Sequence, residues 1–282
     1  MFACSPLQIQ TSNTVVTSAY ATPESYFFDA VRKNSIISVM RLIEEKTVDI
    51  NTRDRYGWTG FMYAARYGHE GLIEYFLTKK ININAHEDKG QTALMIAVNS
   101  RNSQVVDFLL KSGADATIRD GYGFTALMWA IHDKSWDSIP LLLAPNKGID
   151  IQNLDGQTAL HLATRYRLYD IVSLLINNGA NLNIKDSTGS TPLLLAVENR
   201  DKATVELLLA RKKTDINIPD KKGMTALMIA AQGGFENIVI LLVNKGANIA
   251  MKNHEGKTAL ALAKENNHQS VITFFKKRMK KT

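Results

Sequence analysis

Cysteine is almost absent from this chain of 282 residues, and so are apolar runs of membrane length. Its single cysteine, Cys4, excludes an intrachain disulfide and a zinc site built from several cysteines. No apolar run approaches the roughly 20 residues of a membrane-spanning helix, so we expect no transmembrane segment. Residues 1–23 contain no lysine, arginine, aspartate or glutamate and are rich in serine and threonine, which is typical of a flexible leader.

The motifs of common catalytic sites are also missing. No two of the six histidines have the spacing of paired metal ligands, and there is no Cys-x-x-Cys pair. The phosphate-binding pattern Gly-x-x-x-x-Gly-Lys does not occur, and STGST at 187–191 has the wrong order for a Gly-x-Ser-x-Gly nucleophile turn. We therefore expect no enzyme activity, no metal site and no cofactor.

The formal net charge of +7 is concentrated at one end of the chain. Five positive charges lie in the last seven residues, 276–282, and the rest of the chain is left nearly neutral at +2. A basic tail can bind anionic surfaces or act as a nuclear signal, but we favour a solvated end that keeps the last helix soluble. Nucleic acid is therefore not the expected partner.

Two short sequences leave the location of the protein open. FACS, residues 2–5, resembles the end of a bacterial lipoprotein signal, yet the apolar segment that should precede Cys4 is missing. AYA at 19–21 fits a small-x-small cleavage site, but the segment before it is too polar. We expect a cytoplasmic protein, with the bacterial envelope or periplasm as the alternative if the leader is a truncated signal.

What the chain does contain is a repeat. The stretch GYGFTALMWA, residues 121–130, returns as RYGWTGFMYA, DKGQTALMIA, LDGQTALHLA, STGSTPLLLA, KKGMTALMIA and HEGKTALALA. The glycines of the Gly-x-Thr signal are spaced by 33, 33, 33, 33, 34 and 33 residues: Gly57, Gly90, Gly123, Gly156, Gly189, Gly223 and Gly256. A fixed period in this range indicates a solenoid, in which each unit contacts its neighbours.

Each copy has the features of a helix pair. The glycine permits the positive φ of a tight turn, and the threonine two residues later can cap a first helix. In one copy Pro192 follows Thr191 at the first helical position, where a missing N–H costs nothing. A second apolar run, such as VVDFLL at 105–110, predicts a second, mostly buried helix that ends at a glycine such as Gly113.

On these residues the unit resembles the ankyrin repeat, whose motif is Asp-x-x-Gly-x-Thr-Pro-Leu-His-x-Ala. The leading aspartate is present in four copies and replaced in three: Asp54, Asp120, Asp186 and Asp220, against Glu87, Asn153 and Asn253. Only His161 keeps the motif histidine, so its hydrogen bond to the threonine is expected in that copy alone. The resemblance implies an all-α repeat solenoid of stacked helix pairs with β-hairpin fingers.

The expected organisation follows from the repeats. A divergent copy, YFFDAVRKNSIISVMRLIEEKTVDINTRD, precedes the seven with the Gly-x-Thr signal, so we expect about eight. The predicted parts are a flexible polar leader at 1–24, an ankyrin-like array at 25–275 and a basic tail at 276–282. The leading aspartates are expected to bond backbone N–H groups of the turns rather than to act in catalysis.

The partner surface is predicted from the positions that vary between copies, around the turn and at the end of the first helix. In the N-terminal half these carry aromatic residues and arginine, which dominate interface hot spots, whereas later copies carry Ser, Thr, Lys and Glu. The predicted partner-binding residues are Arg53, Arg55, Tyr56, Trp58, Arg66, Tyr67, Lys89, Gln91, Arg119, Tyr122, Phe124, His132, Arg165 and Tyr166. The alternative for the aromatics is packing between fingers. Trp129 shares its phase with apolar residues and is expected in the core.

Two further features lie elsewhere in the repeats. One basic residue recurs between the two helices, and we call this set the basic ladder: Arg101, Lys134, Arg167 and Arg200. We expect it to be a solvated edge, although it could meet an acidic partner. The segment 134–147 predicts an irregular second helix with Pro140 inside and Trp136 exposed. Local distortion is favoured there over a second contact or a hinge.

We interpret the chain as a monomeric, non-enzymatic protein that captures another folded protein on its concave face through repeats two to five. Capture could sequester or inhibit the partner, a plan that suits bacterial ankyrin proteins acting as protective inhibitors or effectors. The alternative is a scaffold or adaptor that joins two proteins and needs a second surface, such as Trp136 or the basic ladder. A third hypothesis, association with nucleic acid or anionic membranes, requires strong salt dependence.

Overall fold

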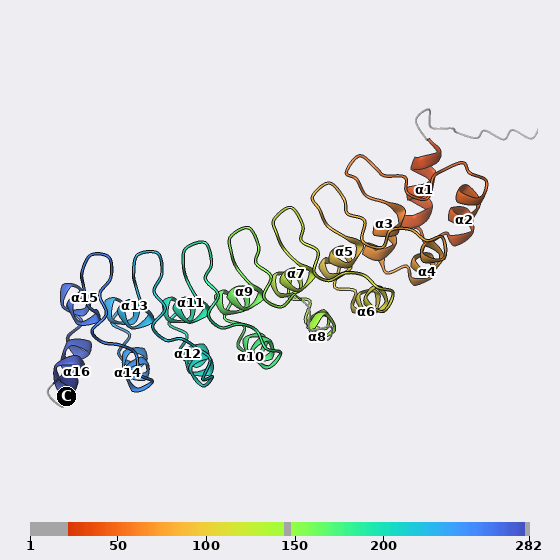
Figure 1. The fold of residues 1–282 in the computed structure, drawn as a ribbon. Coiled ribbons are helices and arrows are strands. Elements are labelled where there is room, and N and C mark those ends of the chain that lie inside the picture. The colour runs from red at the N-terminus through yellow and green to blue at the C-terminus, as the bar shows by residue number, and fades with distance from the viewer. Residues whose placement is uncertain (1–21, 144–147, 280–282) are drawn as a thin grey trace, which may run out of the picture.

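The computed structural model describes residues 22–143 and 148–279, which fold into an elongated arc of stacked helix pairs (Figure 1). FACS, AYA and the end of the basic tail lie outside the described residues. The first helices are α1 (Pro23–Arg32), α3 (Gly60–Tyr67), α5 (Ala93–Asn99), α7 (Ala126–His132), α9 (Ala159–Arg165), α11 (Pro192–Glu198), α13 (Ala226–Gln232) and α15 (Ala259–Glu265). The second helices are α2 (Ile36–Glu44), α4 (Glu70–Thr78), α6 (Ser103–Lys111), α8 (Ser138–Leu143), α10 (Tyr169–Asn177), α12 (Lys202–Leu209), α14 (Glu236–Asn244) and α16 (Gln269–Met279).

The threonine of each Gly-x-Thr signal caps a first helix, as predicted. Thr125 Oγ1 accepts a hydrogen bond from the amide of Met128 over 3.3 Å, and its backbone is extended. The same bond forms in the other copies, at Thr59, Thr92, Thr158, Thr191, Thr225 and Thr258. His161 completes a reciprocal cap, because its Nδ1 accepts from the amide of Thr158 over 3.2 Å.

First helices of successive repeats pack against one another, so the core is one continuous layer along the arc. Small residues at the contacts permit this close approach, and the alanine five residues after each capping threonine has no exposed surface: Ala64, Ala97, Ala130, Ala163, Ala196, Ala230 and Ala263. Buried side chains of the second helices, such as Leu109 and Val172, close the core on the convex side. The predicted all-α repeat solenoid is therefore confirmed.

The fingers contain less β-structure than the predicted β-hairpins. Among the described residues, isolated antiparallel bridges join Arg53 to Thr59 and His86 to Thr92, and no longer strand forms. Each turn is held by two backbone hydrogen bonds and by its leading side chain. In the fourth repeat, Oδ1 of Asp120 accepts hydrogen bonds from two amides of the same turn, each over 2.9 Å.

The copies without a leading aspartate keep the same turn. Glu87 accepts hydrogen bonds from the amides of Lys89 and Gln91 over 2.9 and 3.0 Å. Asn153 accepts the equivalent pair over 3.0 and 2.8 Å. A side-chain oxygen two and four residues before the amides is therefore what the turn requires, and the structural role predicted for the aspartates is confirmed.

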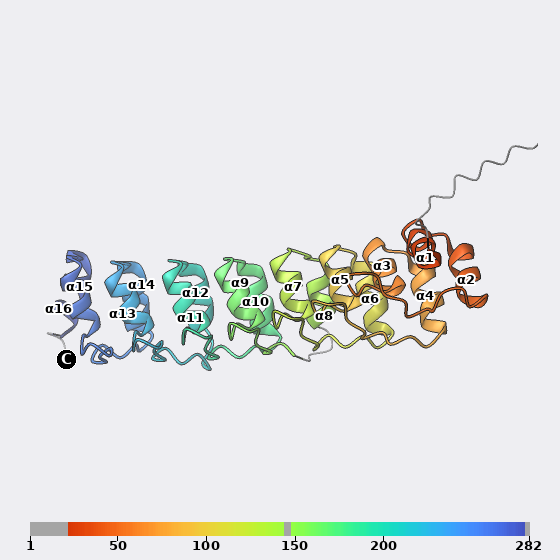
Figure 2. The same ribbon diagram turned by 90° about the horizontal axis from the view of Figure 1, so that it is seen from above.

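Neighbouring fingers are joined by backbone hydrogen bonds at their tips. The amide of Ser187 donates to the carbonyl of Asp155 over 2.8 Å, and equivalent bonds link the fingers from Tyr56 to His254. The turn before this contact requires glycine, since Gly156 has a φ of +72° and a Cβ there would lie 2.8 Å from the Ser187 nitrogen. The fingers line one edge of the molecule and the turns between helices line the opposite edge (Figure 2).

The ends of the array and its irregular helix differ from the regular repeats. Helix α1 begins at Pro23, inside the segment expected to be leader, and α16 carries residues 276–279 of the expected tail on a helix. Helix α8 contains Pro140, and the preceding Trp136 is 45 % exposed, as predicted for this segment. Over the described ranges no helix is long and apolar enough to span a membrane.

Candidate functional site

The concave side of the arc is lined by the fingers and the first helices (Figure 1). Four positions in each repeat, counted from the capping threonine, matter for this face: the residue before it and the residues four, seven and eight after it. In the second and fourth repeats these positions hold aromatic rings that gather into two clusters.

The first ring cluster consists of Trp58, Tyr63, Arg66 and Tyr67. The ring centroids of Trp58 and Tyr63 lie 5.1 Å apart, and Tyr67 stacks on Tyr63 at 6.4 Å. The Arg66 guanidinium lies 5.4 Å from the Trp58 centroid. Trp58 and Tyr63 are half-buried, whereas Arg66 and Tyr67 are exposed. An apolar floor with a polar rim is the usual anatomy of a protein-binding patch.

The second ring cluster consists of Phe124, Trp129, His132 and Tyr166. The centroids of Phe124 and Trp129 lie 5.1 Å apart, and His132 meets Trp129 edge-on at 5.5 Å. Tyr166 comes from the next repeat and lies 6.0 Å from the His132 ring. The His132 Nδ1 is hydrogen-bonded to Oδ1 of Asp133 over 2.6 Å. The cluster therefore spans two neighbouring repeats.

One aromatic hydrogen-bond donor ties each cluster to its finger. Tyr63 donates from its hydroxyl to Oδ2 of Asp54 over 2.7 Å, and Trp129 donates from Nε1 to Oδ2 of Asp120 over 2.8 Å. Burial raises the pKa of Asp54, but the bonds from Tyr63 and two backbone amides outweigh it, and the pKa is lowered. Burial and this carboxylate raise the pKa of Tyr63. These bonds fix the orientation of both rings.

Sequence reasoning misses Tyr63 and the second contact of Trp129. The structure places Trp129 half-buried against the core, where it is expected, and its ring also belongs to the second ring cluster. The signal for both residues is an aromatic donor four residues after the threonine, combined with aspartate five residues before it. Other repeats hold aliphatic residues at the later position, and these cannot donate: Ile96, Leu162, Leu195, Ile229 and Leu262.

Several other predicted partner residues lie on the fingers. Tyr56 and Tyr122, each at a fingertip, are 54 % and 57 % exposed. The Arg55 guanidinium lies 4.7 Å from the centroid of Tyr56. Lys89 is exposed and Gln91 is half-buried on the finger between the two ring clusters. These side chains extend the predicted surface along the finger edge.

Three arginines among the predicted partner residues also bond within the chain. Arg53 donates from Nη1 to the carbonyl of His86 over 2.9 Å, and Arg119 donates likewise to Gln152 over 3.2 Å. The Arg165 guanidinium lies 3.9 Å from a carboxylate oxygen of the next repeat. Arg53 and Arg119 therefore join adjacent fingers, a structural role that their position in the repeat does not reveal. Their part in partner binding stays a prediction.

The concave face changes character beyond the fifth repeat. Lys257 lies 3.0 Å from a carboxylate oxygen of Glu255 and 2.9 Å from one of Glu265. Burial and the nearby charges of Asp220 and Asp186 raise the pKa of Glu198. These acidic and basic side chains line an open cleft of about 620 Å³. Its surface is ionic, in contrast to the two ring clusters.

The basic ladder lies on the turn edge, where all four of its residues have positive φ. Arg101 donates from Nη2 to the carbonyl of Asp133 over 2.8 Å, and Arg167 donates to the carbonyl of Asn199. The Arg200 guanidinium lies 4.4 Å from the ring centroid of the next repeat's Phe235, at the end of the same turn edge. Three ladder residues therefore join neighbouring repeats, and are more than a solvated edge.

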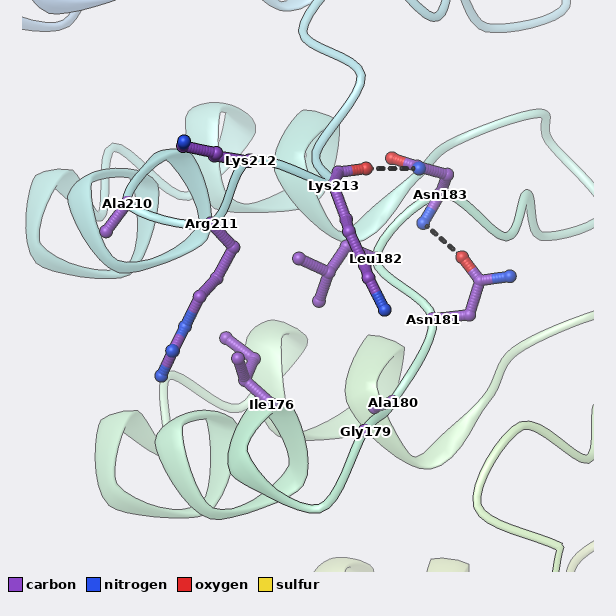
Figure 3. Close-up of a pocket in the computed structure, with 10 residues that line it drawn as sticks. All are labelled: Ile176, Gly179, Ala180, Asn181, Leu182, Asn183, Ala210, Arg211, Lys212 and Lys213. Atoms are coloured by element: carbon purple, nitrogen blue, oxygen red, sulfur yellow. Dashed lines mark hydrogen bonds between the residues drawn. The ribbon is translucent and has the colours of Figure 1, made fainter.

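A cleft of about 670 Å³ lies between the loops that follow α10 and α12, apart from both ring clusters (Figure 3). The second of these loops carries Arg211, Lys212 and Lys213, and the repeat is one residue longer here than its neighbours. Asn183 donates to the carbonyl of Lys213 over 2.7 Å, and Arg211 donates to Oδ1 of Asn177 over 2.6 Å. The cleft therefore coincides with the inserted residue.

The titratable side chains of the described residues include one buried histidine. No group of histidine, cysteine, aspartate and glutamate side chains in the described ranges would hold a metal ion. His161 is buried, and burial lowers its pKa. Its ring atoms serve the helix cap and a hydrogen bond to the carbonyl of Ser190 over 3.1 Å. This histidine therefore has a structural place in the fold.

A family model of ankyrin repeats, built as a unit of three copies, matches residues 27–120, 86–155, 127–220 and 193–281. The chain belongs to the ankyrin-repeat family. Ankyrin repeats are protein-binding modules, and the coarse functional prediction, protein binding, is confirmed at that level. No curated protein matches this chain.

Many solved structures are similar to this ankyrin-repeat chain, among them the following two. The ankyrin repeat domain of Bcl-3, described as a unique member of the IkappaB protein family, is 29 % identical with a TM-score of 0.71. That match covers 78 % of this chain and 100 % of the Bcl-3 domain. A chain from the complex of the predatory endopeptidase Bd0816 of Bdellovibrio bacteriovorus with the immunity protein Bd3460 is 31 % identical, with a TM-score of 0.58. This match covers 66 % of our chain and 97 % of that chain.

Proposed function

We propose that this ankyrin-repeat protein captures one folded protein on the concave face of repeats two to five and masks part of its surface. The observation that carries the proposal is the pair of ring clusters, around Trp58 and Phe124, on the side lined by fingers and first helices. Tyrosine, tryptophan and arginine are the residues that contribute most to protein interfaces. The hydrogen bonds to Asp54 and Asp120 pre-organise the rings, which lowers the entropy lost on binding.

The similarity to a chain from an endopeptidase–immunity protein complex supports a masking role. In such a role the bound partner is an enzyme or toxin whose active surface is covered while the complex lasts. The proposal needs no catalytic group on this chain, and agrees with the structural roles found for its leading aspartates and His161. The partner's own activity is then the quantity that binding changes.

The proposal is tested by affinity capture from the source cells with three immobilised forms of the protein. The wild type is compared with the double variant Trp58→Ala, Phe124→Ala and with Trp136→Ala on the turn edge. A partner of the concave face is retained by the wild type and by Trp136→Ala, and is lost with the double variant. We expect its affinity for the double variant to fall by at least ~2 kcal/mol.

Folding must be checked because Trp58 and Phe124 are half-buried. Thermal unfolding of each variant serves this purpose, and the exposed pair Tyr67→Ala, Tyr166→Ala provides a second test with little effect on the core. Retention of every captured protein by both double variants, with their folds intact, would rule out the concave site. Inhibition of the purified partner by the wild type, and not by the variants, would establish masking.

An adaptor function is the alternative, and one observation favours it. Trp136, Leu168 and Tyr169 line an open groove of about 550 Å³ on the side away from the fingers. Trp136 and Tyr169 are 45 % and 46 % exposed. An adaptor requires two proteins to bind at once, so a captured protein lost only with Trp136→Ala, beside one lost only with the concave variant, would support it.

A further inference from the structure

The first ring cluster carries two guanidinium groups on neighbouring rings. Arg32, from the last turn of α1, lies 5.2 Å from the ring centroid of Tyr63. Arg66 lies 5.4 Å from the centroid of Trp58, and the two rings are themselves 5.1 Å apart. The divergent first repeat therefore contributes a cation to the concave face, next to the cation of the second repeat.

Neither guanidinium has a carboxylate partner within ion-pairing distance among the described residues. Two carboxylates lie near Arg32, whose positive charge helps to lower the pKa of each, and both already have other partners. Asp54 accepts the hydroxyl of Tyr63 and two turn amides, and Asp29 is paired with Lys33 at 2.7 Å. By contrast, Arg53 and Arg119 each donate a side-chain hydrogen bond to a backbone carbonyl of the adjacent finger. Over the described ranges, the side-chain N–H groups of Arg32 and Arg66 form no such bond to a backbone carbonyl, so both guanidinium groups keep donors for a ligand.

A guanidinium that packs on an aromatic ring keeps N–H donors for a planar acceptor. It is also pre-organised, because the ring restricts its rotamers, so fewer degrees of freedom are lost on binding. A carboxylate is the acceptor that matches such a fork with two parallel hydrogen bonds. Phosphate can accept the same pair of hydrogen bonds, but the rings of Trp58, Tyr63 and Tyr67 beside the two cations favour a ligand with an apolar side chain next to its charge.

We propose that Arg32 and Arg66 form an acidic-segment site, in which a partner places an aspartate or glutamate carboxylate between the two guanidinium groups and an apolar side chain on Trp58 and Tyr67. This inference rests on the proposed function, since it names the chemistry of the partner segment that meets the N-terminal end of the concave face. Arg32 is the residue that the repeat pattern alone does not nominate, because the first repeat lacks the Gly-x-Thr signal.

The test is a titration of the full chain with two capped pentapeptides, acetyl-Gly-Glu-Leu-Glu-Gly-amide and its glutamine analogue acetyl-Gly-Gln-Leu-Gln-Gly-amide. Binding is followed by NMR through the Trp58 indole N–H and the arginine Nε–H signals. The glutamate peptide should shift both sets of signals and bind at least five-fold more tightly than the glutamine peptide. Equal binding of the two peptides, or no shift with either, would overturn the proposal.

Variants locate the effect within the molecule. Arg32→Gln and Arg66→Gln should each weaken binding of the glutamate peptide at least five-fold. Arg66→Lys should weaken it at least three-fold, because lysine keeps the charge but lacks the planar pair of N–H donors. Arg101→Gln removes the same charge from the turn edge and serves as the matched control. An equal loss with Arg101→Gln would show a response to net charge alone, and would refute the site.

Inorganic phosphate distinguishes the two anionic chemistries. The proposal expects phosphate to compete with the glutamate peptide only weakly, since it makes no contact with the rings. If phosphate binds at least as tightly as the glutamate peptide, the site is one for a small oxyanion and not for an acidic protein segment. That result would overturn the inference. The capture experiment stays informative in either case: a partner lost with Trp58→Ala, Phe124→Ala but not with Arg32→Gln supports the concave function and contradicts the acidic-segment site.

Discussion

The indole of Trp129 donates a hydrogen bond from Nε1 to Oδ2 of Asp120, 2.8 Å away. Nine residues separate the two, and the same spacing joins Tyr63 to Asp54 over 2.7 Å. In both repeats one carboxylate therefore holds a turn with one oxygen and orients a concave ring with the other. The finger and the helix behind it are coupled in the repeats that carry the aromatic clusters.

Tyr63→Phe tests this coupling with the smallest change, the loss of one oxygen atom. We expect the free energy of unfolding to fall by about 1 kcal/mol, because a half-buried carboxylate loses a hydrogen bond. The pKa of Asp54 should rise, since the Tyr63 hydroxyl helps to lower it. Chemical denaturation and a carboxyl NMR titration measure the two effects. An unchanged Asp54 pKa in the folded variant would show that the hydroxyl does not stabilise the charge.

Gly156→Ala and Gly256→Ala separate backbone strain from finger stacking. Both glycines have positive φ, +72° and +75°, but a Cβ at Gly156 would lie 2.8 Å from the Ser187 nitrogen, whereas Gly256 has open space. We expect Gly256→Ala to cost about 1 kcal/mol of unfolding free energy from strain. Gly156→Ala should cost about 3 kcal/mol, because the next finger must also move. Equal costs in thermal or urea unfolding would argue against a stacking role.

Thr164→Val should stabilise the protein by about 1 kcal/mol. Thr164 is completely buried and its hydroxyl has no hydrogen-bond partner among the described residues, while Val197 occupies the same position in the next repeat and Val98 in the third repeat. Thr204→Val is the matched control, because that buried hydroxyl donates to Asp201 over 2.6 Å and its loss should destabilise the fold. Urea unfolding of both variants should show opposite signs. A destabilised Thr164→Val would mean that its hydroxyl is satisfied in solution.

His161 should make stability fall as the pH is lowered. Burial lowers its pKa from the usual 6.5, so the unfolded chain binds the proton more readily than the folded chain. The contribution of neutral His161 to the free energy of unfolding is complete above pH 6.5. It is lost as the pH falls toward the folded-state pKa, with a slope of at most about 1.4 kcal/mol per pH unit. The variant His161→Met introduces the residue that four other repeats have at this position. It should be less stable than the wild type at pH 8 and should lack this pH dependence. An identical pH profile in both proteins would exclude His161 as its source.

The repeated frame is the part of the fold that the sequence predicts well. Thr125 caps a helix, Ala130 sits in a close helix contact and Asp120 bonds its turn, because each role depends on neighbours at a fixed distance along the chain. Periodicity reports such local relations directly. The fingers are predicted less well, since the resemblance implies β-hairpins, whereas the chain closes each turn with side-chain bonds and two backbone bonds, and the described residues form only two isolated β-bridges.

The side chains on the concave face are predicted less completely, because their roles depend on contacts between repeats. Trp129 stands at a repeat position that holds apolar residues in other copies. Its indole N–H nevertheless needs an acceptor, and Asp120 of the finger provides it. Arg53 looks like a display residue, and it donates to the next finger. Arg32 has no place in the motif and still reaches the ring of Tyr63. In each case the deciding partner lies outside the pattern that defines the repeat.

Hydrogen–deuterium exchange of the protein with and without its captured partner tests the concave-face proposal most directly. We expect binding to slow exchange in 53–67, 119–133 and 160–167, the segments that hold both ring clusters and their fingers. Segments on the opposite edge, including the turn before α8 that holds Trp136, should exchange at unchanged rates. Protection confined to the turn edge, with the ring-cluster segments unaffected, would contradict the account.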